Sequence, residues 1–215
     1  MQRLRIRFSR GEQLKYISHL DLLRLWQRAL NRAGIGLAYS EGFNPHPRMS
    51  LAAPLALGIT SQAELMDIVL DKWSSPHAFT TAITRQLPPG IEVLQVAGIA
   101  MTLPSLQSQV AFSEYYVKIR TNQTRDEIEA SIASLLDKDT LPWQHRRDTG
   151  PHRYDLRKLI DHLWVTDLQD SQVTIGMKLR CDSGGSGRPE QVALALGFPD
   201  YPTSIHRAKL FLKTG

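Results

Sequence analysis

Apolar and polar residues alternate at the start of the chain. In residues 3–8, RLRIRF, Leu4, Ile6 and Phe8 fall on one side and three arginines fall on the other. This period of two predicts a half-buried strand whose outer face is basic. Comparable patterns predict further strands at 35–40, 64–71 and 91–99, and a helix at 76–87 that begins at Pro76.

The period changes to three and four residues after Ser18. Trp26, Leu30 and their apolar neighbours recur at the spacing of a helix with one buried face. Ser18 is a preferred residue for capping the start of a helix, and Asp21 stands where a capping partner belongs. Because Gly34 favours the end of a helix, the pattern predicts a helix between Ser18 and Gly34.

The order of the elements predicts the fold class. Residues 1–100 read as strand, helix, strand, strand, helix, strand, which is typical of a ferredoxin-like (βαββαβ) unit with an antiparallel sheet. A polar, proline-bearing segment at 101–109 is the expected linker. Residues 112–215 repeat the order, with strands at 114–120, within 155–181 and at 205–213, and helices at 125–138 and from Pro189. We therefore predict an α+β protein of two tandem ferredoxin-like units, 1–100 and 112–215.

Positive charge is concentrated in one part of the chain. The net charge is +5, and residues 1–50 hold nine Lys and Arg against three Asp and Glu. Residues 51–110 hold two against four, and the remainder is nearly balanced. A local positive field indicates a polyanion or an acidic protein surface as the partner.

Several classes of site are disfavoured by composition. The single cysteine, Cys181, allows no internal disulfide, no cysteine metal site and no iron–sulfur cluster of the chain's own. The seven histidines never stand at ligand spacing on one helix, so we expect no bound metal and no cofactor. The first residues do not form a signal peptide and no stretch has the length of a membrane span. We expect a soluble, cytoplasmic protein without a membrane partner.

Three arginines share one face of the first predicted helix. Arg24, Arg28 and Arg32 stand four residues apart, opposite the apolar stripe. A second basic row, Arg3, Arg5 and Arg7, is expected on the first strand, and few acidic residues lie nearby in the sequence. Two interpretations remain: an anion-binding surface, or a solvated helix face that serves solubility.

The most unusual stretch is residues 39–50, YSEGFNPHPRMS. Gly42 permits a positive φ, and Pro45 and Pro47 hold His46 on a stiff, extended backbone. A neutral histidine can act as an acid, a base or a ligand, and an aromatic side chain can stack on a base. The candidate residues are Phe43, Asn44, His46 and Arg48. The competing interpretation is a rigid connection that happens to expose a histidine.

Two stretches of the second half are weaker candidates. The glycines of SGGSGRPE, residues 183–190, would let backbone amides approach a phosphate, but the stretch lacks the P-loop lysine and equally fits a hairpin-to-helix turn. Residues 145–158, HRRDTGPHRYDLRK, combine cations with Tyr154. That composition suits single-stranded nucleic acid, or a surface neutralised through Asp148 and Asp155.

Five stretches together are typical of one known family: KYISHLDLLRLWQRALNRAG, LAYSEGFNPHPRMSLAAPLALGI, ELMDIVL, YDLRKLI and SGGSGRPEQVALAL. Through them, and most specifically through SEGFNPHPR, the chain resembles the radical SAM-linked family of uncharacterised bacterial proteins. Members are encoded beside, or fused to, a cobalamin-domain radical SAM protein, so the resemblance implies that protein as a partner. It implies importance for Asn44, Pro45, His46, Pro47 and Arg48, followed by Gly42, Asp155, Arg157, Gly187, Arg188 and Pro189.

Three hypotheses follow. The chain could be a non-catalytic recognition module that presents RNA, or an RNA-bound protein, to the radical SAM enzyme through its basic face. It could be a metal-independent endoribonuclease, similar in plan to CRISPR repeat-processing enzymes, with His46 as general base. It could also be an adaptor that only docks the radical SAM protein. The candidate ligand-binding residues are Arg24, Arg28, Arg32, Phe43, Asn44, His46, Arg48, Arg157, Gly187 and Arg188.

Overall fold

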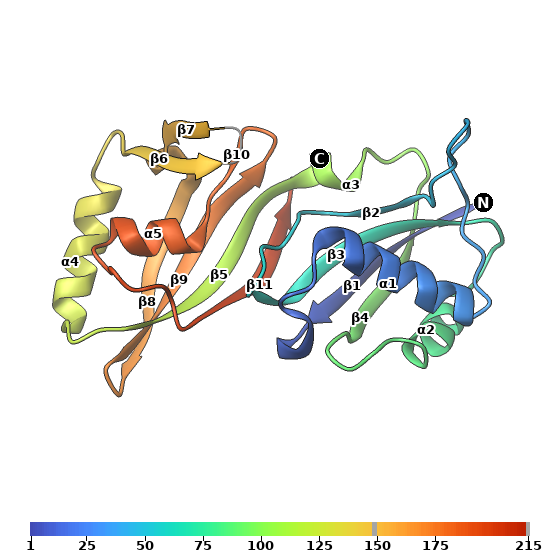
Figure 1. The fold of residues 1–215 in the computed structure, drawn as a ribbon, viewed down its shortest axis with the longest axis horizontal. Helices are drawn as coiled ribbons and strands as arrows, with labels where there is room; N and C mark the ends of the chain where they lie inside the picture. Colours follow the sequence, from blue (N-terminus) through green and yellow to red (C-terminus); the bar gives the residue numbers. More distant parts are fainter. Residues whose placement is uncertain (148–149, 214–215) are drawn as a thin grey trace. The chain divides into compact units, whose positions relative to one another are not determined.

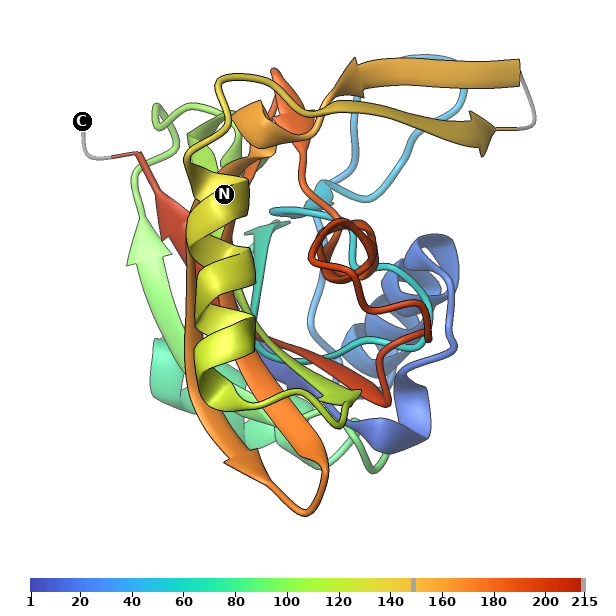
Figure 2. The same cartoon turned by 90° about the vertical axis from the view of Figure 1, so that its left-hand side faces the viewer.

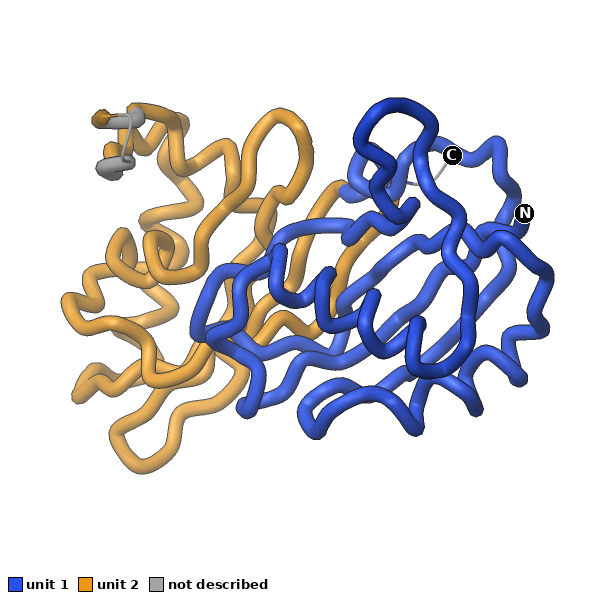
Figure 3. Tube along the Cα trace, turned by 45° about the vertical axis from the view of Figure 1, so that its right-hand side comes forward, with its two compact units in different colours: residues 1–110, 213–215 blue, residues 111–212 orange. Residues whose placement is uncertain are grey.

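A computed structural model describes residues 1–147 and 150–213, and for residues 145–147, 151 and 152 the backbone alone. The chain divides into two compact units (Figure 3): unit 1 is residues 1–110 with Lys213, and unit 2 is residues 111–212. Each unit combines helices with an antiparallel sheet, so the predicted α+β class is confirmed.

Unit 1 combines an antiparallel sheet with three α-helices (Figure 1). Strand β1 pairs with β3 and with β4, and the short β2 pairs with β3, always antiparallel. The order across the sheet is therefore β4-β1-β3-β2. The elements are β1 (Gln2–Arg10), η1 (Glu12–Leu14), α1 (His19–Arg32), β2 (Met49–Leu51), β3 (Thr60–Leu70), α2 (Pro76–Thr84), β4 (Val93–Ile99) and α3 (Leu106–Gln109).

Helix α1 is fixed at its start and along one side. Ser18 accepts a hydrogen bond from the backbone N–H of Asp21 and donates its hydroxyl to Asp21 Oδ2 at 2.7 Å. Trp26 is fully buried, and its ring meets the edge of Phe8 with centroids 5.0 Å apart. The predicted cap and apolar stripe are confirmed, and Gly34, at φ +70°, follows the end of the helix. Because the cap and the core hold α1 rigidly, its outer face is presented in a defined position.

Residues 35–40 do not form the predicted strand. Within this segment Leu37 forms an isolated β-bridge with Leu70, and Tyr39 forms one with Pro47. The regular strand of this region is β2, which follows the loop of residues 40–47. The physical reason is that residues 35–40 and the segment around Arg48 share the backbone hydrogen-bonding groups of Val69 on β3. The carbonyl of Val69 accepts from Ala38, while its N–H donates to the carbonyl of Arg48 at 2.9 Å. Both arms of the loop therefore share one edge of the sheet.

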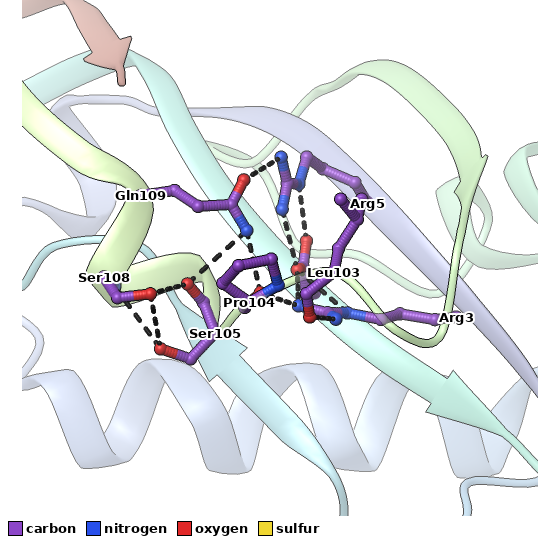
Figure 4. Close-up of polar contacts among 8 residues, drawn as sticks. Arg3, Arg5, Leu103, Pro104, Ser105, Ser108 and Gln109 are labelled. Atoms are coloured by element: carbon purple, nitrogen blue, oxygen red, sulfur yellow. Dashed lines mark hydrogen bonds and ion pairs between the residues drawn. The ribbon is translucent and has the colours of Figure 1, made fainter. Parts of the chain in front are cut away.

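The outer face of β1 is not the open basic row that the sequence predicted. Arg3 and Arg5 both pair with the carboxylate of Asp67 on β3, at 2.7 and 2.8 Å. Arg3 also donates to the carbonyls of Leu103 and Pro104, and the Arg5 guanidinium donates to the side chain of Gln109 (Figure 4). The pairing neutralises part of the charge of residues 1–50. It also fastens segment 101–109, predicted as a plain linker, to unit 1.

Unit 2 repeats the alternation of strands and helices. Strand β9 pairs antiparallel with β8 and with β5, and β11 follows β5 in the sheet. The hairpin β6–β7, which the sequence did not predict, projects away from α4 (Figure 2). The elements are β5 (Val110–Arg120), α4 (Arg125–Leu136), β6 (Pro142–Arg147), β7 (Gly150–Asp155), η2 (Arg157–Leu159), β8 (Ile160–Gln169), β9 (Gln172–Asp182), β10 (Gly185–Ser186), α5 (Pro189–Ala195) and β11 (Ser204–Leu212).

Candidate functional site

The three arginines of α1 line a surface groove of about 520 Å³. One wall is α1, and the other is the segment that follows α2. Successive arginines are four residues apart, so they advance by roughly 6 Å along the helix. The lining residues are Ile17, Asp21, Arg24, Leu25, Arg28, Arg32, Gln86, Leu87 and Pro88. We call this hollow the arginine groove.

The three guanidinium groups differ in how they are engaged. Arg24 forms an exposed ion pair with Asp21 at 3.1 Å. Arg32 crosses the groove and donates to the carbonyl of Gln86 at 2.6 Å. Arg28 forms no hydrogen bond or ion pair with any residue that the structure describes. Arg28 is therefore the group most ready to receive an anion, between two others already held in position.

Asp21 is the one carboxylate in the groove lining. A hydrogen bond from the Ser18 hydroxyl, then one from Arg24, lowers the pKa of this carboxyl, and the charges of Arg24 and Arg28 act in the same direction. Asp21 therefore stays ionised at neutral pH and offsets one of three positive charges. The arginine groove keeps a positive excess.

Residues 40–47 form a stiff, projecting loop in unit 1, near the N-terminus (Figure 1). The backbone N–H of Ser40 donates to the carbonyl of His46, and the N–H of His46 returns a bond to Ser40 Oγ, both at 2.9 Å. Gly42 has φ +119°, so the turn at the tip needs a glycine. Phe43 is fully exposed, at 108% of its reference area. We call this element the Phe43 loop.

The side chains of the Phe43 loop face solvent. Asn44 and His46 are exposed, as is Arg48 just after the loop, and the Arg48 guanidinium lies 4.0 Å from Met1 Sδ. Within the part of the chain that the structure describes, the imidazole of His46 makes no hydrogen bond. A general base is usually oriented by a second group, and no such group is in place here.

The structure does not bring the arginine groove and the Phe43 loop into one cavity. Tyr39, at the base of the loop, receives a hydrogen bond from Gln27 on one flank of α1. The groove opens on the other flank, beside Leu25, and no residue of the loop lines it. The two features are neighbours around one helix, so a ligand touching both must be larger than a single small molecule.

Arg157, on η2, is engaged within unit 2. Its guanidinium donates to the carbonyl oxygens of Leu136 at 3.1 Å and of Ile160 at 2.8 Å. Asp155 accepts hydrogen bonds from the backbone N–H groups of Leu141 and Arg157. These hydrogen bonds join the end of α4 to the start of β8. Arg157 and Asp155 therefore have a structural role within unit 2.

The glycine-rich stretch 183–190 is a turn from β9 through β10 into α5. The N–H of Gly187 donates to the carbonyl of Arg180 at 2.9 Å, so it is not available to a phosphate. A Cβ at this position would lie 2.9 Å from Leu179 Cβ, and the close packing requires glycine. The structure supports the hairpin-to-helix interpretation. Arg188 is exposed where α5 begins.

The basic cluster 145–158 falls on the hairpin β6–β7, and its predicted neutralising residue Asp148 lies outside the described residues. Tyr154 of this cluster bonds through its hydroxyl to Gln191 on α5. Among the side chains that the structure describes, no three His, Cys, Asp or Glu residues gather as metal ligands. No helix in the described ranges is both long and apolar enough to cross a membrane.

Sequence reasoning missed the second wall of the arginine groove. Gln86, Leu87 and Pro88 were seen only as the end of a helix, and no local signal shows that this segment lies against α1. Asp67 was equally missed as the partner of the strand arginines, because it stands more than sixty residues away. A carboxylate within an otherwise apolar strand is the signal that could have found it.

The fold and site define an α+β protein of two sheet-bearing units with an arginine-lined groove on unit 1. The chain belongs to the family described as uncharacterized protein conserved in bacteria (DUF2344), whose profile matches residues 3–189. The resemblance to an uncharacterised bacterial family is thereby confirmed, while the radical SAM association stays a prediction. No protein with a curated description matches the chain.

Solved structures are similar in fold. The crystal structure of a Cbf5-Nop10-Gar1 complex matches with a TM-score of 0.59 and 10% identity, over 98% of this chain and 50% of the solved chain. An archaeal box H/ACA Nop10-Cbf5 complex and an H/ACA RNP bound to a substrate RNA each match with a TM-score of 0.49 and 10% identity. This chain spans about half the length of those chains. At 10% identity the likeness to the Cbf5-Nop10-Gar1 structure shows the fold alone.

Proposed function

We propose that the chain is a non-catalytic recognition module that binds RNA through unit 1. The observation that carries the proposal is the arginine groove, in which three guanidinium groups line one hollow and Arg28 makes no hydrogen bond or ion pair with the described residues. Planar guanidinium groups suit phosphate oxygens, and a regular row suits a repeating polyanion better than a single anion. In this account Arg24, Arg28 and Arg32 hold phosphates.

The Phe43 loop supplies recognition beyond charge. Phe43 presents a bare aromatic ring at the tip of a stiff loop, where it stacks on an unpaired base. Asn44, His46 and Arg48 provide donors and acceptors for the same feature of the RNA. Because phosphate contacts position a nucleic acid and base contacts specify it, the groove supplies affinity and the loop supplies selectivity.

The partner enzyme is proposed to be a radical SAM protein. The support is the resemblance carried by the SEGFNPHPR string at residues 40–48, which marks a family associated with such enzymes. In this account the partner holds the cluster and performs the chemistry, and this chain presents the RNA. A purely protein-binding adaptor is the second candidate, and the exposed Phe43 favours it, because a bare aromatic side chain can also anchor a protein interface.

Each unit is inferred to be ferredoxin-like. In unit 1 the elements β1, α1, β2, β3, α2, β4 carry the sheet order β4-β1-β3-β2, and adjacent strands are antiparallel. In unit 2 the elements β5, α4, β8, β9, α5, β11 carry the corresponding order β8-β9-β5-β11. The matching strand orders support a tandem arrangement of two such units, in which the hairpin β6–β7 is an insertion in the second unit.

The experiment that tests the proposed function is recovery of cellular RNA with the purified chain. The wild type is compared with the variant Arg24→Glu/Arg28→Glu at low salt. RNA enriched by the wild type and lost by the variant would support the recognition module and identify its ligand. If the wild type recovers no RNA but retains a protein, the adaptor takes its place.

Removing the carboxylate of Asp21 is expected to strengthen RNA binding, whereas the loss of groove arginines weakens it. We expect Asp21→Asn to raise the affinity for RNA about threefold, because it frees Arg24 from a charge at 3.1 Å. The helix cap is kept, because its hydrogen bond runs from the backbone N–H of residue 21 to Ser18 Oγ, and the amide oxygen of asparagine can still accept the Ser18 hydroxyl. Fluorescence anisotropy with labelled RNA measures the effect. Glu129→Gln on α4 is the matched control with the same change in net charge, and a lower affinity for Asp21→Asn would count against RNA in the groove.

A further inference from the structure

Three neighbouring strands of unit 2 present an aligned face of aromatic and charged side chains. The odd-numbered residues within 113–119 of β5 and 173–179 of β9, such as Val117 and Ile175, are buried, so the even-numbered residues between them point to the opposite side. Strand pairing sets these residues in rows across β8, β9 and β5. The rows are His162–Lys178–Glu114, Trp164–Gly176–Tyr116, Asp167–Thr174–Lys118 and Gln169–Gln172–Arg120. We call them together the outer face of unit 2.

The second row is an aromatic platform. The indole of Trp164 lies directly over Gly176, where a Cβ would collide with the ring, so the glycine lets the indole lie close against the strand. The ring of His162 stacks beside the indole, with centroids 5.4 Å apart and planes 24° apart. Tyr116 meets the same indole edge-on at 6.5 Å. Trp164 is half-buried and His162 is exposed, so part of the platform faces solvent.

A polar groove of about 650 Å³ continues the face from the third row onward. Lys118 and Arg120 line it, together with hydroxyl, amide and carboxylate side chains that can bond to the edges of bases. The lining residues are Lys118, Arg120, Thr121, Asn122, Asp167, Gln169, Asp170, Ser171, Gln172, Thr174 and Asp200.

The outer face of unit 2 carries both positive and negative side chains, and two of its cations are held in ion pairs. Lys178 is held by Asp161 at 2.8 Å, and Arg180 by Asp182 at 2.9 Å. The exposed cations Lys118, Arg120 and Lys209 then lie beside the carboxylates of Glu114, Asp167, Asp170 and Asp200. Lys209 lies over the ring of Phe211, at 4.7 Å, which keeps a cation beside an aromatic surface. Stacking rings beside separate cations are the combination that single-stranded nucleic acid requires.

We propose that the outer face of unit 2 binds single-stranded RNA, with a base stacked on the Trp164 platform and the backbone following Lys118 and Arg120. The inference rests on the proposed function, because it takes RNA as the ligand. It adds a second binding surface on a different unit. The carboxylates of Asp167, Asp170 and Asp200 accept the amino groups of adenine or cytosine, so oligoadenylate binds more tightly than oligouridylate, whose bases lack an amino group.

The test is binding of fluorescein-labelled oligoadenylate to the full chain, measured by anisotropy. Trp164→Leu is expected to weaken binding about tenfold, because one base loses its stacking surface. Trp73→Leu is the matched control, since Trp73 is 76% exposed and lies outside the outer face. Thermal unfolding confirms that both variants are folded. Equal affinity of Trp164→Leu and the wild type, or equal losses for both tryptophans, would overturn the proposal.

A second variant keeps the test independent of Trp164. Lys118→Gln/Arg120→Gln is expected to reduce the slope of log affinity against log salt by about 1.4. An unchanged slope overturns the assignment of the backbone path. The variant Arg24→Gln/Arg28→Gln in the same assay separates the two surfaces. Sensitivity to the α1 variant alone overturns the outer face and leaves the proposed function standing. Sensitivity to Trp164 alone overturns the arginine groove as the RNA site and leaves the outer face standing. If the wild type binds no oligonucleotide, both are overturned.

Discussion

Replacing Asp67 by alanine is expected to lower the free energy of unfolding by about 3–5 kcal/mol. The Asp67 side chain is 3% exposed and faces two guanidinium groups, those of Arg3 and Arg5, which are 11% and 16% exposed. Removing one carboxylate leaves two largely buried cations side by side without their counter-ion. The same change loosens segment 101–109, because Arg3 would no longer be oriented toward Leu103 and Pro104.

Urea unfolding followed by circular dichroism measures this loss. Glu129→Ala is the control, because the ion pair of Arg125 and Glu129 on α4 is about half exposed and surface pairs contribute roughly 0–1 kcal/mol. A cost below about 1 kcal/mol for Asp67→Ala would mean that water, and not Asp67, satisfies the two arginines. The ion pairs of Asp67 within the network drawn in Figure 4 would then contribute little to the free energy of unfolding.

Reversing two charges in the arginine groove is expected to weaken RNA binding on the order of a thousandfold. In Arg24→Glu/Arg28→Glu each phosphate contact is lost and replaced by repulsion, and one unit charge at contact distance in water is worth about 1 kcal/mol. Both side chains lie on the outer flank of α1, away from the buried Trp26, so the fold is expected to survive. Anisotropy with the RNA recovered from cells gives the affinity.

The control must change the net charge equally. The variant Arg125→Glu/Lys138→Glu does so at two exposed positions of unit 2. Arg125 is the first residue of α4, and Lys138 lies just after its last residue. We expect this pair to change the affinity by less than about threefold at moderate salt, since neither residue lines the groove and salt screens exposed charges that do not contact the RNA. If both pairs weaken binding equally, RNA responds to the overall charge of the chain and the groove has no special role.

Local patterns were sufficient to predict α1 and its arginine face. Ser18 and Gly34 mark the limits of the helix, and the four-residue spacing of Arg24, Arg28 and Arg32 places them on one side whatever the rest of the chain does. The alternation of residues 3–8 likewise predicted β1. In these cases the information lies within a few residues of the element that it specifies.

Features that depend on distant residues could not be predicted. Asp67 neutralises the β1 arginines because β3 pairs beside β1, and the groove exists because residues 86–88 return to α1. The segment 35–40 has a strand-like composition, but it bonds only to the carbonyl of Val69 on β3, because the N–H of Val69 donates to Arg48 on the other side of the Phe43 loop. The aromatic platform of unit 2 is formed by Trp164, Gly176 and Tyr116, which only strand register brings together.

The salt dependence of RNA binding tests the central claim most directly. If three arginines of the groove each hold one phosphate of a single strand, they contribute about −2 to the slope of log affinity against log salt. In Arg24→Gln/Arg28→Gln this contribution should shrink to about −0.7, so the slope is expected to become shallower by about 1.4. A slope that is the same in the wild type and the variant would show that α1 does not hold the RNA backbone, and would contradict the account.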